Sequence, residues 1–65
     1  MTISLEDRKF EDVTGSSIAD NIKKQITGSS LFYFVKIGDK LFSVSGSQEY
    51  SEQINVMATA MSAIK

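Results

Sequence analysis

The segment from Leu31 to Val44, LFYFVKIGDKLFSV, decides the fold, because it has the pattern of two strands joined by a tight turn. Gly38 and Asp39 supply the Gly-X sequence of a two-residue type II′ hairpin turn. This turn also fixes the register of the two strands. The expected pairs are Ile37 with Lys40, Val35 with Phe42, and Tyr33 with Val44.

Both faces of this predicted hairpin carry large apolar side chains. One face presents Leu31, Tyr33, Val35, Ile37, Phe42 and Val44. The other presents Phe32, Phe34 and Leu41, together with Lys36, Ser43 and Ser45. One apolar face is enough to build a small core, so the second face must be covered by another part of the chain or by a partner.

An amphipathic helix is predicted after Ser47, which is suited to cap its N-terminus, with Glu49 in the first turn. The apolar residues at helical spacing are Tyr50, Ile54, Met57, Ala58, Met61 and Ile64. A second ridge of mostly small side chains lies beside them and consists of Val56, Ala60 and Ala63. Small side chains let another helix approach closely, and the expected neighbour is a first helix of the same chain.

That first helix is predicted between two Gly/Ser clusters, with Ser17 as its N-cap and Gly28 as its terminator. Its apolar positions are Ile18, Ala19, Ile22 and Ile26. The first thirteen residues fit neither period well. A strand from Thr2 to Leu5 is the favoured interpretation there, and a short helix from Leu5 to Asp12 is the alternative.

Together these elements predict a single compact α+β domain over residues 1–65, with element order β-α-β-β-α. The expected architecture is an antiparallel or mixed sheet of about three strands with two helices on one face. A chain of this length buries only about 60% of the surface of its unfolded form. Because the sequence lacks cysteine and histidine, either oligomerisation or unusually good packing remains as a further source of stability.

The lack of histidine and cysteine also excludes Ser-His and Cys-His nucleophiles and the usual zinc ligands. We therefore expect a protein that is not an enzyme and holds neither a metal nor a cofactor. The only oxygen-ligand candidates are Glu6, Asp7, Glu11 and Asp12. Arg8 and Lys9 lie among them, so a solvated charged edge is the favoured interpretation.

Charge and hydropathy narrow the choice of partner. The net charge of −1 disfavours bulk nucleic-acid binding. The longest run without a formal charge, residues 53–64, is shorter than the roughly 18 to 20 apolar residues that cross a bilayer. Charged residues from Glu6 onward leave no room for the apolar core of a signal peptide, so we expect a cytoplasmic protein that does not bind membranes.

The second hairpin face gives the main functional hypothesis, a non-catalytic protein-interaction module that also forms homo-oligomers. Phe32, Phe34 and Leu41 are the expected anchors, and Lys36 would orient the contact. The ridge of Val56, Ala60 and Ala63 is a second candidate surface. Alternatively, Ile3, Leu5 and Phe10 fold across the anchors and close the core within one chain. A regulator, adaptor or inhibitor fits this hypothesis, and phage and mobile-element proteins offer an analogy of size and composition.

A competing hypothesis is a small-ligand protein that binds or sequesters a nucleotide or another phosphate-bearing molecule. Helix N-termini attract anions through their free N–H groups and dipole. The residues that would hold the phosphate are Ser16, Ser17 and Ser47, helped by Lys40.

Overall fold

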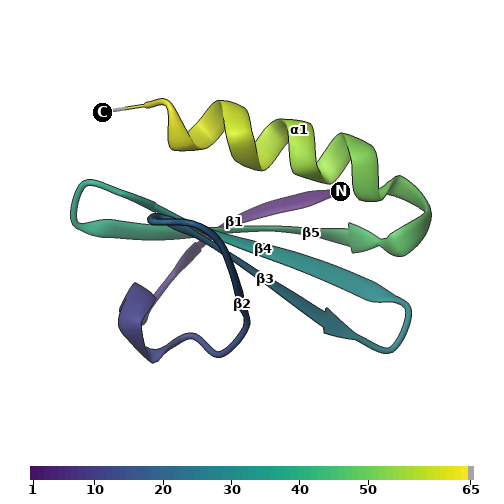
Figure 1. Ribbon diagram of the computed structural model, residues 1–65, viewed down its shortest axis with the longest axis horizontal. Helices are drawn as coiled ribbons and strands as arrows, with labels where there is room; N and C mark the ends of the chain where they lie inside the picture. Colours follow the sequence, from purple (N-terminus) through teal and green to yellow (C-terminus); the bar gives the residue numbers. More distant parts are fainter. Residues whose placement is uncertain (65) are drawn as a thin grey trace.

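The computed structural model describes residues 1–64, which form one antiparallel sheet covered on one face by a single helix (Figure 1). The strands are β1 (Thr2–Glu6), β2 (Ser16–Ala19), β3 (Ile22–Thr27), β4 (Ser30–Ile37) and β5 (Lys40–Ser47). Two 3-10 turns, η1 (Phe10–Asp12) and η2 (Gln48–Tyr50), and the helix α1 (Ser51–Ser62) complete the fold. The strand order is β1-β5-β4-β3-β2, so β2 to β5 form a meander and β1 is added beside β5.

The central β4–β5 hairpin has the predicted register. Ile37 lies opposite Lys40, Val35 opposite Phe42, and Tyr33 opposite Val44. Gly38 has a φ of +62°, whereas Asp39 keeps a negative φ, as a type II′ turn requires. The predicted turn and register of the segment from Leu31 to Val44 are therefore confirmed.

The predicted three-stranded sheet with two helices is wrong, because the segment expected to be the first helix folds as the β2–β3 hairpin. Ile22 and Ile26 are four residues apart, a spacing that suits a helix and also places them on one face of a strand. Gly28 does not end a helix. Its φ of +61° forms a Gly-X turn between β3 and β4, like the turn at Gly38.

The helix α1 covers one face of the sheet, and the predicted C-terminal helix is confirmed. Its buried residues are Ile54, Ala58 and Met61. They pack in one cluster with Ile22, Leu31, Tyr33, Val35 and Val44. The Ser47 hydroxyl accepts a hydrogen bond from the Glu49 N–H, but this cap belongs to η2, and α1 begins four residues later.

The opposite face is covered by the segment between β1 and β2, which lies below the sheet in Figure 1. Phe34 and Leu41 are only 2% and 3% exposed, and they pack in one cluster with Val13. Phe10 and Phe32 are partly buried against this cluster. The chain therefore closes its second apolar face with its own N-terminal segment.

Two features hold this segment against the sheet. The Lys23 ammonium donates hydrogen bonds to the carbonyls of Phe10 (2.8 Å) and Val13 (3.0 Å) and lies 4.4 Å from the centre of the Phe10 ring. Gly15 approaches β3 so closely that a Cβ there would lie 2.6 Å from the carbonyl oxygen of Lys24. Replacing the hydrogen of Gly15 with a side chain would push the segment away from the sheet.

We predict that Lys23→Met lowers the free energy of unfolding by about 1.5 to 3 kcal/mol, because two carbonyl groups lose a charged hydrogen-bond donor. Urea denaturation measures the loss. Lys24→Met is the matched control, since within residues 1–64 the Lys24 ammonium forms no hydrogen bond or ion pair and lies 6.0 Å from the Tyr33 ring centre, so its removal is expected to cost less than about 1 kcal/mol. Equal losses in the two variants would contradict this role for Lys23.

Candidate functional site

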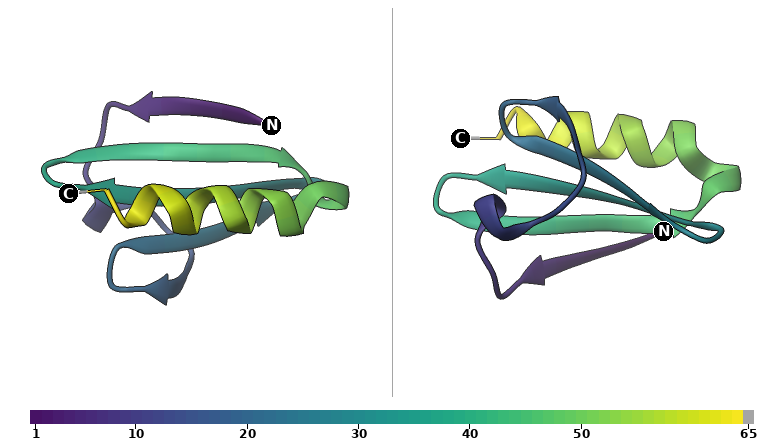
Figure 2. Two further views of the ribbon diagram at one scale, coloured as in Figure 1. Left: turned by 90° about the horizontal axis from the view of Figure 1, so that it is seen from above. Right: turned by 60° about the horizontal axis from the view of Figure 1, so that its bottom comes forward.

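The helix α1 covers the central strands of the sheet but does not reach its β1 edge, and this uncovered edge creates the candidate site. Seen from above, α1 runs along the strands, and β1 lies at the edge of the sheet clear of the helix (Figure 2). The contacts of α1 with the sheet are chiefly with β4 and β5. Two hydrogen bonds show which side of the helix faces β3. The Asn55 amide donates to the Tyr33 hydroxyl (3.0 Å), and the Asn21 amide, from the β2–β3 turn, donates to the Ser62 carbonyl (3.4 Å).

The other side of α1 faces β5 and the uncovered edge strand β1. With about 3.6 residues per turn, Gln53, Met57 and Ala60 lie on the side of the helix opposite Asn55. A groove of about 320 Å³ runs along this side and its outer edge. It is lined by Glu52, Gln53, Val56, Met57 and Ala60.

Strand β1 adds two apolar side chains to the same face of the sheet. Ile3 lies opposite Val44 and Leu5 opposite Phe42, so both point to the helix side. They are 48% and 63% exposed because α1 does not reach them, and Val56 on the helix is 63% exposed. We call the groove residues together with Ile3, Leu5 and Phe42 the α1–β1 surface.

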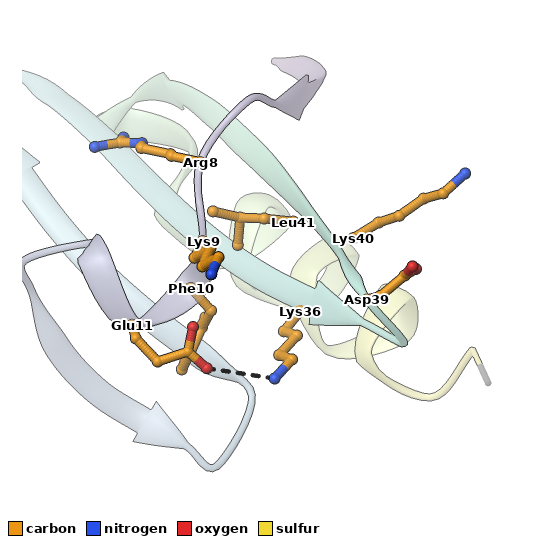
Figure 3. A pocket seen from close by; sticks show the side chains of 8 residues that line it. All are labelled: Arg8, Lys9, Phe10, Glu11, Lys36, Asp39, Lys40 and Leu41. Atoms are coloured by element: carbon orange, nitrogen blue, oxygen red, sulfur yellow. Dashed lines mark hydrogen bonds and ion pairs between the residues drawn. The ribbon is translucent and has the colours of Figure 1, made fainter.

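A second hollow lies at the β4–β5 turn, where charged side chains gather (Figure 3). It has a volume of about 220 Å³. Its lining residues are Arg8, Lys9, Phe10, Glu11, Lys36, Asp39, Lys40 and Leu41. The Lys36 ammonium lies 3.5 Å from the Glu11 carboxylate. Figure 3 shows the Lys40 side chain extending away from the other residues. The hollow thus combines cations with carboxylates that offset their charge.

Arg8 and Glu11 in this hollow are tied to the fold. The Arg8 guanidinium is paired with Glu6 (3.1 Å) and lies 5.0 Å from the centre of the Phe34 ring. The pKa of Glu11 is lowered from its ordinary value, chiefly because its own backbone N–H donates to the carboxylate and next because the Lys36 ammonium is near. These contacts give both residues a structural role.

The residues expected to anchor a partner are only partly at the surface. Phe34 and Leu41 are buried beneath Phe10 and Val13, which corrects the expectation that they are exposed. Phe32 is partly buried, and Lys36 lines the charged hollow. The three residues of the helix ridge, Val56, Ala60 and Ala63, are all exposed.

The predicted phosphate site is not assembled. Ser16 and Ser17 belong to strand β2, so they do not precede a helix as expected. Ser47 lies at the C-terminal end of β5, whereas Lys40 lies at its N-terminal end. The structure therefore separates these residues, and an anion would lose the helix N-terminus that the hypothesis needed at Ser16 and Ser17.

Residues 1–64 form neither a cluster of metal ligands nor a membrane-spanning helix. In this part of the chain, no three carboxylate, histidine or cysteine side chains come close enough to hold a metal ion. The same residues contain no helix with the length and apolar character needed to cross a membrane.

Sequence reasoning missed the part of the α1–β1 surface that comes from β1. In the alternative in which the chain closes its own core, Ile3, Leu5 and Phe10 fold across Phe32, Phe34 and Leu41. Phe10 does pack there, but the register of β1 against β5 puts Ile3 and Leu5 on the opposite face. Their alternation with Thr2, Ser4 and Glu6 was a signal for a strand with one apolar face. Which face of the sheet it would join is a tertiary property.

Comparisons of the chain with protein-family models, curated proteins and solved structures found no significant match. The case for a function therefore depends on the geometry of the surfaces described above.

We predict that Glu11→Gln removes stability only at a pH where the Glu11 carboxylate is charged. A carboxyl whose pKa is lowered by folding stabilises the native state fully above its ordinary value of 4.5 and loses this effect as the pH falls through the lowered pKa. The difference in unfolding free energy between the parent and the variant should be constant above pH 4.5 and shrink below it. Urea denaturation over a series of pH values measures it, and a difference that grows on acidification would contradict the prediction.

Proposed function

We propose that this protein is a small non-catalytic protein-interaction module, acting as a regulator, adaptor or inhibitor, that uses the α1–β1 surface and associates with itself. The observation that carries the proposal is that α1 does not reach β1, which leaves Ile3 and Leu5 about half exposed or more, while Val56 is exposed on the outer side of the helix. An apolar patch of this kind, rimmed by polar side chains, is typical of a place where two proteins meet.

The energetic argument favours coverage of this surface. Fully burying a large aliphatic side chain contributes about 1.5 to 3 kcal/mol, and the three exposed side chains retain roughly half of that contribution for a contact. Phe42 and Met57, which belong to the same surface, are partly buried and already pack against the core. A partner would therefore extend an existing core instead of building a new one.

The available chemistry supports a non-catalytic role. The sequence contains neither histidine nor cysteine. In the charged hollow, Glu11 has a lowered pKa and an ion pair with Lys36, which are the properties of a permanently charged surface carboxylate. A general acid or base needs a pKa near the working pH, so this group is poorly suited to proton transfer.

A photo-crosslinking experiment tests the proposal. A benzophenone amino acid at position 56, in the cells that produce the protein, is expected to form a covalent adduct with a protein when irradiated. The matched control is the same group at position 59, because Thr59 is also exposed on α1 but lies on the side facing away from β1. A failure to form an adduct at position 56, or equal yields at the two positions, would contradict the proposed function.

A further inference from the structure

The sheet has two edge strands, and they differ in how they are protected. At one edge, β2 is short and its register against β3 shifts between Ser17 and Ala19. Short strands and irregular registers hinder pairing with another chain. At the other edge, β1 pairs with β5 along its whole length without a shift, and it contains neither proline nor lysine. Its outer side lies clear of the other elements in Figure 2. Strand β1 therefore presents a regular and unprotected edge.

The register shows which backbone groups of β1 face this open edge. The two residues that flank the β4–β5 turn bond to each other, and bonded pairs then alternate with non-bonded pairs along the two strands. Phe42 and Val44 are therefore bonded to β4 and not to β1. Ile3 lies opposite Val44, and Leu5 lies opposite Phe42. It follows that Ile3 and Leu5 turn their N–H and C=O groups outward, away from β5.

A hydrogen bond on the other side of β4 agrees with this alternation. The Lys36 N–H donates to the carbonyl of Asn21, in the β2–β3 turn (2.9 Å). Ile37, the next residue, flanks the β4–β5 turn and pairs with Lys40 in β5. Neighbouring residues of β4 thus bond in opposite directions, which is the alternation that places the backbone groups of Ile3 and Leu5 at the edge.

Ile3 and Leu5 therefore combine two features that require the same kind of occupant. Their side chains are about half exposed or more on the helix side of the sheet. Their backbone groups, two residues apart, are open to another chain. An extended segment carries N–H and C=O groups at the same spacing and apolar side chains on one face, so it matches both features. A helix uses its backbone groups internally and matches only the side chains.

We propose that β1 receives an extended segment of a partner protein as an additional antiparallel strand, an inference that rests on the proposed interaction function. The segment pairs with the backbone groups of Ile3 and Leu5, and its side chains at these positions lie beside theirs. Glu6 is the only charged residue of β1, and it is already paired with Arg8 (3.1 Å). The matching segment is therefore uncharged, with apolar residues two positions apart.

A library of short random peptides supplies the probe, and hydrogen exchange measured by NMR supplies the readout. Peptides selected for binding to the purified chain are expected to carry apolar residues two positions apart. In the complex, the amides of Ile3 and Leu5 should exchange about tenfold or more slowly than in the free chain, because they become bonded. The amide of Ser17, in the other edge strand, should not change. A selection that yields no binding peptide, or a complex in which the Ile3 and Leu5 amides stay unprotected, overturns the proposal.

A backbone change at the edge gives the second test. N-methylation of the Leu5 nitrogen, in a chemically synthesised chain, removes the outward donor and retains the side chain. The bonds to β5 do not involve this group, so circular dichroism should show a folded chain. The selected peptide should bind about tenfold or more weakly. N-methylation at Ser17 is the matched control and should leave peptide binding unchanged. Equal binding by the parent and both methylated chains overturns the proposal.

The same measurements separate a partner segment from a second copy of this chain. If the Ile3 and Leu5 amides are protected without peptide, and the protection grows with protein concentration, the edge pairs with another copy and the proposal is overturned. The photo-crosslink at position 56 tests the interaction function separately, because Val56 lies on α1. An adduct there together with an unprotected β1 edge leaves the interaction function standing and rejects the added strand.

Discussion

The whole structure depends on the β4–β5 hairpin, whose two strands carry large apolar side chains on both faces. A two-faced hairpin must sit in the middle of the molecule, between two covers. The helix α1 supplies one cover through Ile54 and Ala58, which are fully buried. The segment between β1 and β2 supplies the other through Phe10 and Val13, and Lys23 fixes it to the sheet by binding two of its carbonyl groups.

The candidate site follows from a mismatch between the sheet and its cover. Five strands are wider than one helix, and the buried side chains of α1 pack on β3, β4 and β5. Strand β1 extends the sheet past β5 and brings Ile3 and Leu5 to a face that the chain does not cover. The N-terminal segment of the chain thus buries Phe34 and Leu41. A different apolar surface, on the opposite face of the sheet, stays exposed.

The sequence predicted those elements whose local pattern allows only one interpretation. The turn at Gly38, the strand register and the C-terminal helix are of this kind, and the structure confirms them. The β2–β3 hairpin was missed because Ile22 and Ile26 suit both a helix and a strand, while the turn at Asp20 and Asn21 was read as part of a helix. The segment around Phe10 and Val13 shows neither a helical nor a strand period in its sequence. Hydrogen bonds from Lys23, which is distant in the chain, hold it in place, and no local pattern predicts them. The candidate site divides in the same way. Helical spacing within one element predicts the ridge of Val56 and Ala60, whereas the side of the sheet on which Ile3 and Leu5 lie depends on the pairing of β1 with the distant strand β5.

Native-state hydrogen exchange tests the central position of the hairpin most directly. The amides of β4 and β5 that bond within the sheet should exchange only through global unfolding, with a free energy equal to that measured by denaturant. Amides in β2, an exposed edge strand, should exchange through smaller openings. If Tyr33, Val35 and Val44 exchange as readily as the edge strands, the hairpin does not organise the fold, and this account of the structure is wrong.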